Sequence, residues 1–156
     1  MKFAISYFYQ IRNFKKNMIP ISTAMFDPLW YHDFKEENHI FIDKRGIVNG
    51  LRALDFYPGK SCEGLCHGKE ECGGAPESCA FLREYRKQLD KIDLKIFIKE
   101  CNNLLSRLKN KIELEGEPIF VFIVYEAPSN PCSERRVLID YFKDNNIECE
   151  ELEYPI

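Results

Sequence analysis

The sequence lacks any long apolar run. The longest one, Ile119 to Tyr125, falls far short of the roughly 20 apolar residues that a membrane-spanning helix needs. The N-terminal segment also lacks the pattern of a signal peptide, because charged residues interrupt its apolar stretch and no small-residue cleavage site follows. We therefore expect a cytoplasmic protein with no membrane partner.

The chain also has little net charge, no internal repeat and no low-complexity segment. Its formal net charge is −3 over 156 residues, so nothing attracts it generally to nucleic acid, although a local basic patch is still compatible with this balance. Hydrophobic residues make up 45% of the chain, which is ample for one core at this length. We expect residues 1–156 to form a single domain.

Hydrophobic periodicity predicts an α/β order of elements. Strands are expected at 2–8, 18–24, 39–43, 118–125 and 147–154, and helices from about 76–78 to 92, from 97 to 112 and over 132–145. Pro20 places the second strand at a sheet edge or at the strand start. Residues 118–125 are apolar on both faces, as is typical of a central strand in a parallel sheet. The last strand, helix and strand would form a right-handed βαβ unit.

Four of the seven cysteines lie in a loop rich in glycine and proline, residues 55–79. They are Cys62, Cys66, Cys72 and Cys79. Thiols stay reduced in the cytosol, so cysteines this dense favour a metal site over disulfides. Four thiolates suit a closed structural zinc site that leaves no position for substrate, and they would also suit an iron–sulfur cluster. The spacing differs from paired CxxC knuckles, so four free cysteines are the alternative, and His67 could replace one thiol.

The segment after the predicted central strand carries a candidate active site. In a parallel α/β sheet, ligands bind beyond the carboxyl ends of the strands. Cys132 stands where a helix should begin, and there the helix dipole favours an anion and lowers the pKa of a thiol. The candidate catalytic residues are Cys132 and Glu126, and the candidate ligand-binding residues are Asn130, Ser133, Glu134 and Arg135.

Helix capping is the alternative interpretation of this segment, with Ser133 as the N-cap and Arg135 on a solvated surface. Only two residues separate Cys132 from Arg135. Phosphatase-type cysteine catalysis uses a longer loop between these residue types, so that specific chemistry is not supported.

Polar side chains also follow the other predicted strands. If those strands are parallel, their carboxyl ends meet at one edge of the sheet, and the side chains converge with Cys132. These further candidate ligand-binding residues are Ser6, Tyr7, Ser22, Thr23, Asp27, Lys44 and Arg45. For each of them the alternative is ordinary turn chemistry. Trp30 and Phe34 are interpreted as core or as a lid, and base stacking is a further possibility.

Several segments, in order along most of the chain, resemble the bacterial and phage family called domain of unknown function 488. They are Ser6 to Phe8, Ile19 to Ala24, Phe26 to Tyr31, Asp43 to Gly46, Asn49 to Arg52, Tyr125 to Pro128 and Asn130 to Arg135. The family's usual Cys-His-Arg is replaced here by Cys132-Ser133-Glu134-Arg135, so chemistry that depends on the histidine is not carried over. The resemblance implies a Rossmann-like fold, with a mostly parallel sheet flanked by helices and the cysteine-rich loop inserted, and a site at Cys132 to Arg135. It supplies no reaction.

Three functions are compatible with these features, and the reaction, if there is one, is not specified. The first is binding or processing of a nucleotide or nucleic-acid-derived anionic ligand at the carboxyl edge of the sheet, which we favour. The second is a metal-stapled interaction module without catalysis, which predicts an exposed aromatic surface around residues 26–34 and an oligomer or partner. The third is a thiol redox sensor that uses Cys132 or Cys101, although Cys101 lies on an apolar helix face and is expected in the core.

Overall fold

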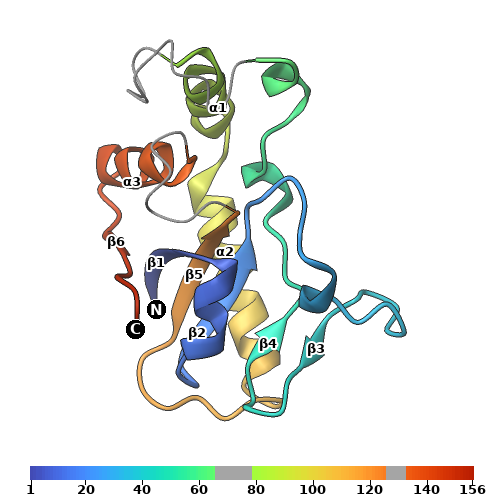
Figure 1. The fold of residues 1–156 in the computed structure, drawn as a ribbon. Helices are drawn as coiled ribbons and strands as arrows, with labels where there is room; N and C mark the ends of the chain where they lie inside the picture. Colours follow the sequence, from blue (N-terminus) through green and yellow to red (C-terminus); the bar gives the residue numbers. More distant parts are fainter. Residues whose placement is uncertain (66–78, 126–132) are drawn as a thin grey trace.

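A four-stranded parallel sheet forms the centre of the molecule (Figure 1). The structure is a computed structural model that describes residues 1–65, 79–125 and 133–156. The strand order is β2-β5-β1-β6, and each neighbouring pair is parallel. The strands are β1 (Lys2–Tyr7), β2 (Met18–Ser22), β5 (Ile119–Val124) and β6 (Cys149–Glu151). The predicted α/β class is confirmed.

Two sequence signals place the strands correctly. β5 lies between β1 and β2, and its residues from Phe120 to Val124 are at most 2% exposed. A strand that is apolar on both faces can be buried on both, which is why it takes the centre. β2 contains Pro20 and lies at an edge, where the missing backbone N–H leaves no ladder position empty. Both predictions are confirmed.

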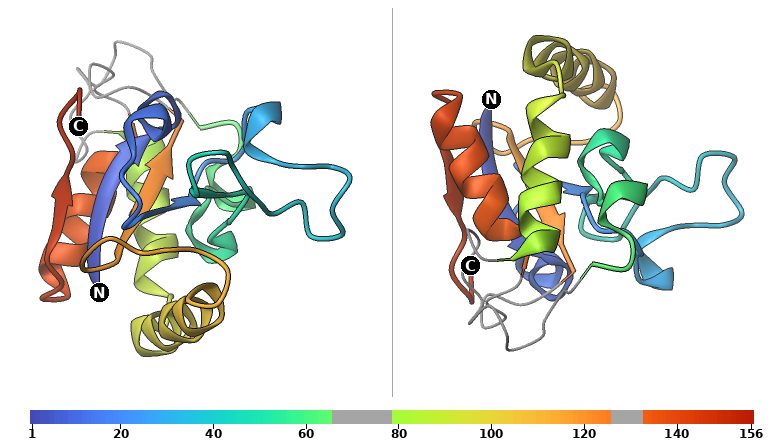
Figure 2. Two further views of the ribbon diagram at one scale, coloured as in Figure 1. Left: turned by 90° about the horizontal axis from the view of Figure 1, so that it is seen from below. Right: turned by 90° about the horizontal axis from the view of Figure 1, so that it is seen from above.

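Three α-helices pack against one face of the sheet (Figure 2). They are α1 (Ala80–Asp90), α2 (Leu94–Leu108) and α3 (Arg135–Asp144). We call the apolar cluster between these helices and the sheet the helix-side core. At its centre Phe122 of β5 stacks on Phe142 of α3, with ring centroids 4.9 Å apart, and on Phe56, 5.4 Å away. Phe56 belongs to η3 (Leu54–Phe56), which η4 (Lys60–Cys62) follows.

The other face of the sheet is covered by short 3₁₀ turns and a hairpin. These elements are η1 (Phe8–Asn13), η2 (Leu29–Tyr31), β3 (Phe41–Ile42) and β4 (Val48–Asn49). Phe8, Ile11, Tyr31 and Ile47 are buried there against Ala4, Val121 and Ile123 of the sheet. We call this cluster the hairpin-side core.

The third predicted strand does not join the parallel sheet, which corrects our expectation. β3 pairs with β4 in a separate antiparallel sheet of two strands. The physical reason is the turn between them. Asp43 accepts the backbone N–H groups of Arg45 and Ile47, and Gly46 has φ +85, so the chain reverses at once. Asp43 to Arg45 therefore lie at the turn of this hairpin and do not follow a strand of the main sheet.

Candidate functional site

A buried carboxylate lies beyond the carboxyl end of β2. The side chain of Asp27 is 4% exposed. Its Oδ1 accepts the Ser22 hydroxyl at 2.5 Å, and its Oδ2 lies 2.7 Å from Nε2 of His32 and 3.3 Å from Nε of Arg52. A carboxylate leaves water at high cost unless it is paired and hydrogen-bonded, and these three partners meet that need.

Backbone pairing brings Arg52 to this cluster. The N–H of Ser22 donates to the carbonyl of Leu51 at 2.8 Å, and the N–H of Ala53 donates to the carbonyl of Ser22 at 2.9 Å. Sequence reasoning named Ser22 and Asp27 but missed His32 and Arg52 as their partners. The only sequence signal for Arg52 was its place in a segment of the family resemblance.

One ring nitrogen of His32 is not engaged by the contact with Asp27. Among the described residues, Nδ1 of His32 is buried and has no hydrogen-bond partner. A neutral imidazole that donates Nε2–H to a carboxylate keeps a lone pair on Nδ1. Because Asp27 stands between Ser22 and His32, the cluster is not a Ser-His-Asp triad, in which the histidine contacts the serine.

The other predicted residues of the strand ends are placed differently. The hydroxyl of Thr23 donates to the carbonyl of Ile123 at 3.0 Å, so it stabilises the end of the sheet. Ser6 and Ser22 both lie in register with Ile123 of β5, one on each side of it. The Ser6 hydroxyl is buried and has no hydrogen-bond partner within the described part of the chain. Tyr7 is the last residue of β1 and packs partly buried against the helix-side core.

The residues at the start of α3 are buried or make contacts within the protein. Ser133 is fully buried, and its hydroxyl accepts the backbone N–H of Arg135 at 3.3 Å. Glu134 occupies the N-cap position and is 8% exposed. Nε of Arg135 lies 3.3 Å from Oε1 of Glu151 on β6, so an anionic ligand would compete with that carboxylate. The predicted Glu126, Asn130 and Cys132 lie outside the described residues.

Two of the four predicted metal ligands can be placed. Cys62 ends η4 and Cys79 precedes α1, and each is 2% exposed in the helix-side core. Cys66 and Cys72, with His67, lie outside the described residues. Within residues 1–65, 79–125 and 133–156, no three His, Cys, Asp or Glu side chains gather as metal ligands would.

The remaining described cysteines are in environments that suppress reactivity. Burial raises the pKa of Cys101 to about 12 and that of Cys149 to about 12, so both thiols stay protonated at neutral pH. The reactive form of cysteine is the thiolate. Cys101 is 3% exposed, which confirms that it belongs to the core.

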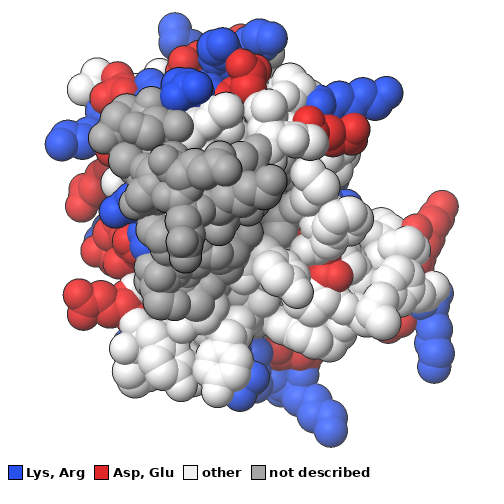
Figure 3. Space-filling view, turned by 45° about the horizontal axis from the view of Figure 1, so that its top comes forward, with Lys and Arg blue, Asp and Glu red and all other residues white. Residues whose placement is uncertain are grey.

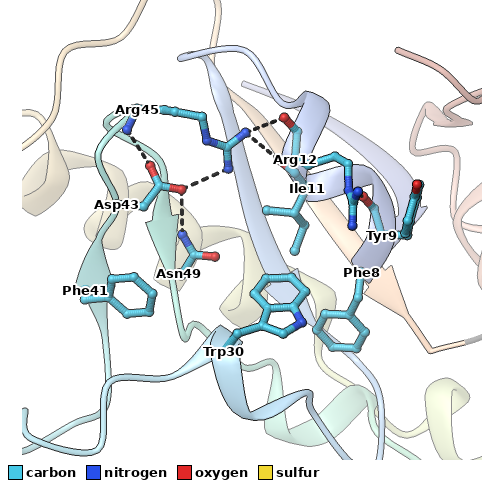
Figure 4. A pocket seen from close by; sticks show the side chains of 9 residues that line it. All are labelled: Phe8, Tyr9, Ile11, Arg12, Trp30, Phe41, Asp43, Arg45 and Asn49. Atoms are coloured by element: carbon cyan, nitrogen blue, oxygen red, sulfur yellow. Dashed lines mark hydrogen bonds and ion pairs between the residues drawn. The ribbon is translucent and has the colours of Figure 1, made fainter.

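A cavity of about 570 Å³ opens between η1, η2 and the hairpin (Figure 4). The aromatic rings of Phe8, Tyr9, Trp30 and Phe41 line it. Phe8 directly follows β1, and its ring centroid lies 6.4 Å from that of Tyr125, the residue after β5. The cavity therefore lies on the hairpin side of the sheet, beside the carboxyl ends of its two inner strands.

Two arginines at this cavity have different roles. Arg45 donates from Nη1 to the carbonyls of Ile11 and Arg12, at 2.9 and 2.6 Å, and its Nη2 pairs with Asp43 at 2.9 Å. Arg45 thus ties the hairpin to η1. The guanidinium of Arg12 lies 3.6 Å over the ring of Tyr9 and has no acidic partner among the described residues. Lys44 is exposed at the hairpin tip and does not line the cavity.

Apolar side chains are exposed along the segment that leads into η2. Phe26 is 74% exposed, Leu29 78%, Trp30 52% and Phe34 60%. In Figure 3 one part of the surface is mostly white, with few acidic or basic side chains. We call Phe26, Leu29, Trp30 and Phe34 the aromatic patch.

The described residues contain no helix that has both the length and the apolar character needed to cross a membrane. A scan against protein-family models, a search of curated proteins and a search of solved structures gave no significant match to this chain.

Proposed function

We propose that this chain is a Rossmann-like domain that binds a nucleotide or a nucleic-acid-derived anionic ligand beside the carboxyl edge of its sheet. The observation that carries this proposal is the cavity with four aromatic rings and Arg12 at its side. Its volume is within the range of roughly 300–1,000 Å³ that small-molecule sites occupy. Aromatic side chains stack on the flat face of any base, and a guanidinium without an acidic partner pairs well with phosphate.

The proposal assigns any reaction to the loop after β5, with Cys132 and Glu126 as the chemical groups and Asn130 as a ligand-binding group. The contact between Phe8 and Tyr125 supports this assignment, because it places the exit of β5 beside a wall of the cavity. His32, whose Nε2 lies 2.7 Å from Oδ2 of Asp27, is a further candidate base. The resemblance to the domain of unknown function 488 family supports the same region of the fold.

Fluorescence of Trp30 provides a direct test, because it is the only tryptophan of the chain and lines the cavity. We expect titration with AMP, CMP, GMP and UMP to change this fluorescence saturably for at least one nucleotide. The Arg12→Gln variant should weaken that binding about tenfold, the value of one exposed charge-assisted contact.

Lys44→Gln is the matched control. It removes one positive charge from the neighbouring hairpin tip, away from the cavity wall, and should change the affinity by less than about twofold. No saturable binding of any of the four nucleotides, or equal losses in the two variants, would refute the proposal.

We also propose that Cys62, Cys66, Cys72 and Cys79 hold a structural zinc ion, with an iron–sulfur cluster as the alternative. The burial of Cys62 and Cys79 in one apolar cluster supports this proposal. A thiol deep in an apolar cluster can be deprotonated at low cost only when a metal compensates its charge.

A non-catalytic interaction module is the second candidate function, and the aromatic patch favours it. Several exposed apolar side chains in one segment mark a contact surface more often than single scattered ones do. Sedimentation velocity over a range of concentrations tests the homo-oligomeric version. A monomer at every concentration, in wild type and in Phe34→Ser alike, would rule that version out.

A further inference from the structure

The side-chain amide of Asn49 is held in one orientation beside the cavity. Asn49 is 2% exposed, and its Nδ2 donates to Oδ2 of Asp43 at 3.3 Å and to the carbonyl of Ile47 at 3.1 Å. Both of its N–H groups are therefore used. A flip of the amide would turn Oδ1 toward two acceptors, which cannot donate to it.

Asp43 makes this orientation permanent at neutral pH. Its carboxylate also accepts the backbone N–H groups of Arg45 and Ile47 and the guanidinium of Arg45. Burial opposes ionisation of Asp43, but these hydrogen bonds outweigh burial and lower its pKa. Asp43 consequently has no proton to offer, and the Asn49 amide can only present its nitrogen to it.

The oxygen of Asn49 is left as an acceptor at the cavity. Oδ1 of Asn49 accepts no hydrogen bond from any described residue. In Figure 4 this oxygen points away from Asp43, into the space between Ile11 and Trp30. An acceptor atom that faces a cavity and lacks a protein partner favours ligands that bring a donor.

We propose that the cavity selects an aromatic base that carries an exocyclic amine, such as that of adenine. Asn49 Oδ1 accepts a hydrogen bond from this amine. The inference rests on the proposed function and specifies its ligand. In this arrangement the base lies against Trp30 and Phe41, its amine donates to Asn49, and its phosphate reaches Arg12. A base without the donor leaves the Asn49 oxygen unpaired, and sites that hydrogen-bond an N–H discriminate strongly against such analogues.

The test compares two ligands that differ in one group. AMP and purine riboside 5′-monophosphate share ring, sugar and phosphate, but the second has neither the 6-amino group nor a ring N–H. We expect wild-type protein to bind AMP at least about tenfold more tightly. Because this comparison uses the wild-type chain, it does not depend on any variant folding.

Two variants test whether Asn49 is the residue that hydrogen-bonds to the base. Asn49→Ala should bring the two affinities within about twofold of each other, and Asp43→Asn should reduce the ratio because the amide can then rotate. A wild-type protein that binds both nucleotides equally would overturn this inference and leave the proposed function intact. A ratio that survives in folded Asn49→Ala would overturn the role of Asn49. Binding of neither nucleotide would overturn this inference, whereas the proposed function fails only if CMP, GMP and UMP also do not bind.

Discussion

Gly50 is a position where one added methyl group should disturb the hairpin beside the cavity. It follows Asn49 and has φ +98. A Cβ built on it would lie 2.5 Å from the carbonyl oxygen of His39 and 3.0 Å from Cα of Ile40. Real Cβ atoms do not approach backbone this closely, so the backbone must move. The His39 carbonyl is itself held in place, because it accepts the N–H of Asp33 at 3.0 Å.

The cost of Gly50→Ala can be summed from these contacts. Positive φ costs an L-residue about 1–2 kcal/mol. Overpacking against backbone costs about 1–3 kcal/mol, and loss of the Asp33–His39 hydrogen bond costs about 1 kcal/mol. Reduced entropy of the unfolded chain returns about 0.4–1 kcal/mol. We expect a net loss of about 2–5.5 kcal/mol in the free energy of unfolding.

Gly46→Ala is the matched control. Gly46 lies in the same hairpin with φ +85, and a Cβ there would meet nothing within 4 Å. It incurs the same conformational cost without the collision, so we expect a loss of only about 1 kcal/mol. Urea unfolding followed by far-UV circular dichroism and by Trp30 fluorescence measures both. With a slope of about 2 kcal/mol/M, the midpoints should differ by about 0.5–2 M, and equal midpoints would refute the steric argument.

Three further predictions concern stability, pH and metal. Tyr85→Phe should cost about 1–2 kcal/mol in thermal denaturation, because the fully buried hydroxyl donates to a backbone carbonyl of η3 that would lose its partner; an unchanged melting temperature would contradict this. The pKa of Asp43 is lowered in the folded state from its ordinary value of 3.8, so its contribution to stability is complete above 3.8 and is lost as pH falls through the lowered pKa. The stability difference between wild type and Asp43→Asn, measured by urea unfolding at several pH values, should therefore be constant near neutrality and shrink in acid, and growth in acid would show the sign to be wrong. Elemental analysis should find zinc in the wild-type protein and much less in Cys62→Ser and Cys79→Ser, whereas Cys101→Ser, which is equally buried, should retain it; full zinc content in either of the first two would remove that cysteine from the site.

Local sequence patterns were enough to locate most elements of the sheet and its helices. The apolar segment that becomes β5 could only be stable when covered on both faces. Phe81, Leu82, Tyr85 and Leu89 recur at helical spacing and bury one side of α1. Helix boundaries were less accurate, since α1 begins at Ala80 and α2 already ends at Leu108. Helix ends depend on single capping contacts such as those of Asp93 at the start of α2.

The candidate site was only partly predictable. Ser22 and Asp27 were named from their place after a strand, and they do contact each other. Lys44 and Arg45 follow a strand that turns back as a hairpin and not a strand of the main sheet, so Arg45 reaches the cavity from the hairpin and Lys44 does not line it. His32 and Arg52 escaped notice because nothing local marks a side chain whose partner is brought to it by pairing between β2 and residues 51–53.

The sequence by itself determined the α/β class, the central and edge strands, and the amphipathic faces of the helices. These properties follow from backbone sterics and apolar periodicity, which act between residues that are close along the chain. Only the tertiary structure decided which polar groups meet, such as Asp27 with Arg52, and which way the Asn49 amide faces. Such contacts join segments that are distant in sequence, and the orientation of one amide depends on the complete hydrogen-bonding of its neighbours.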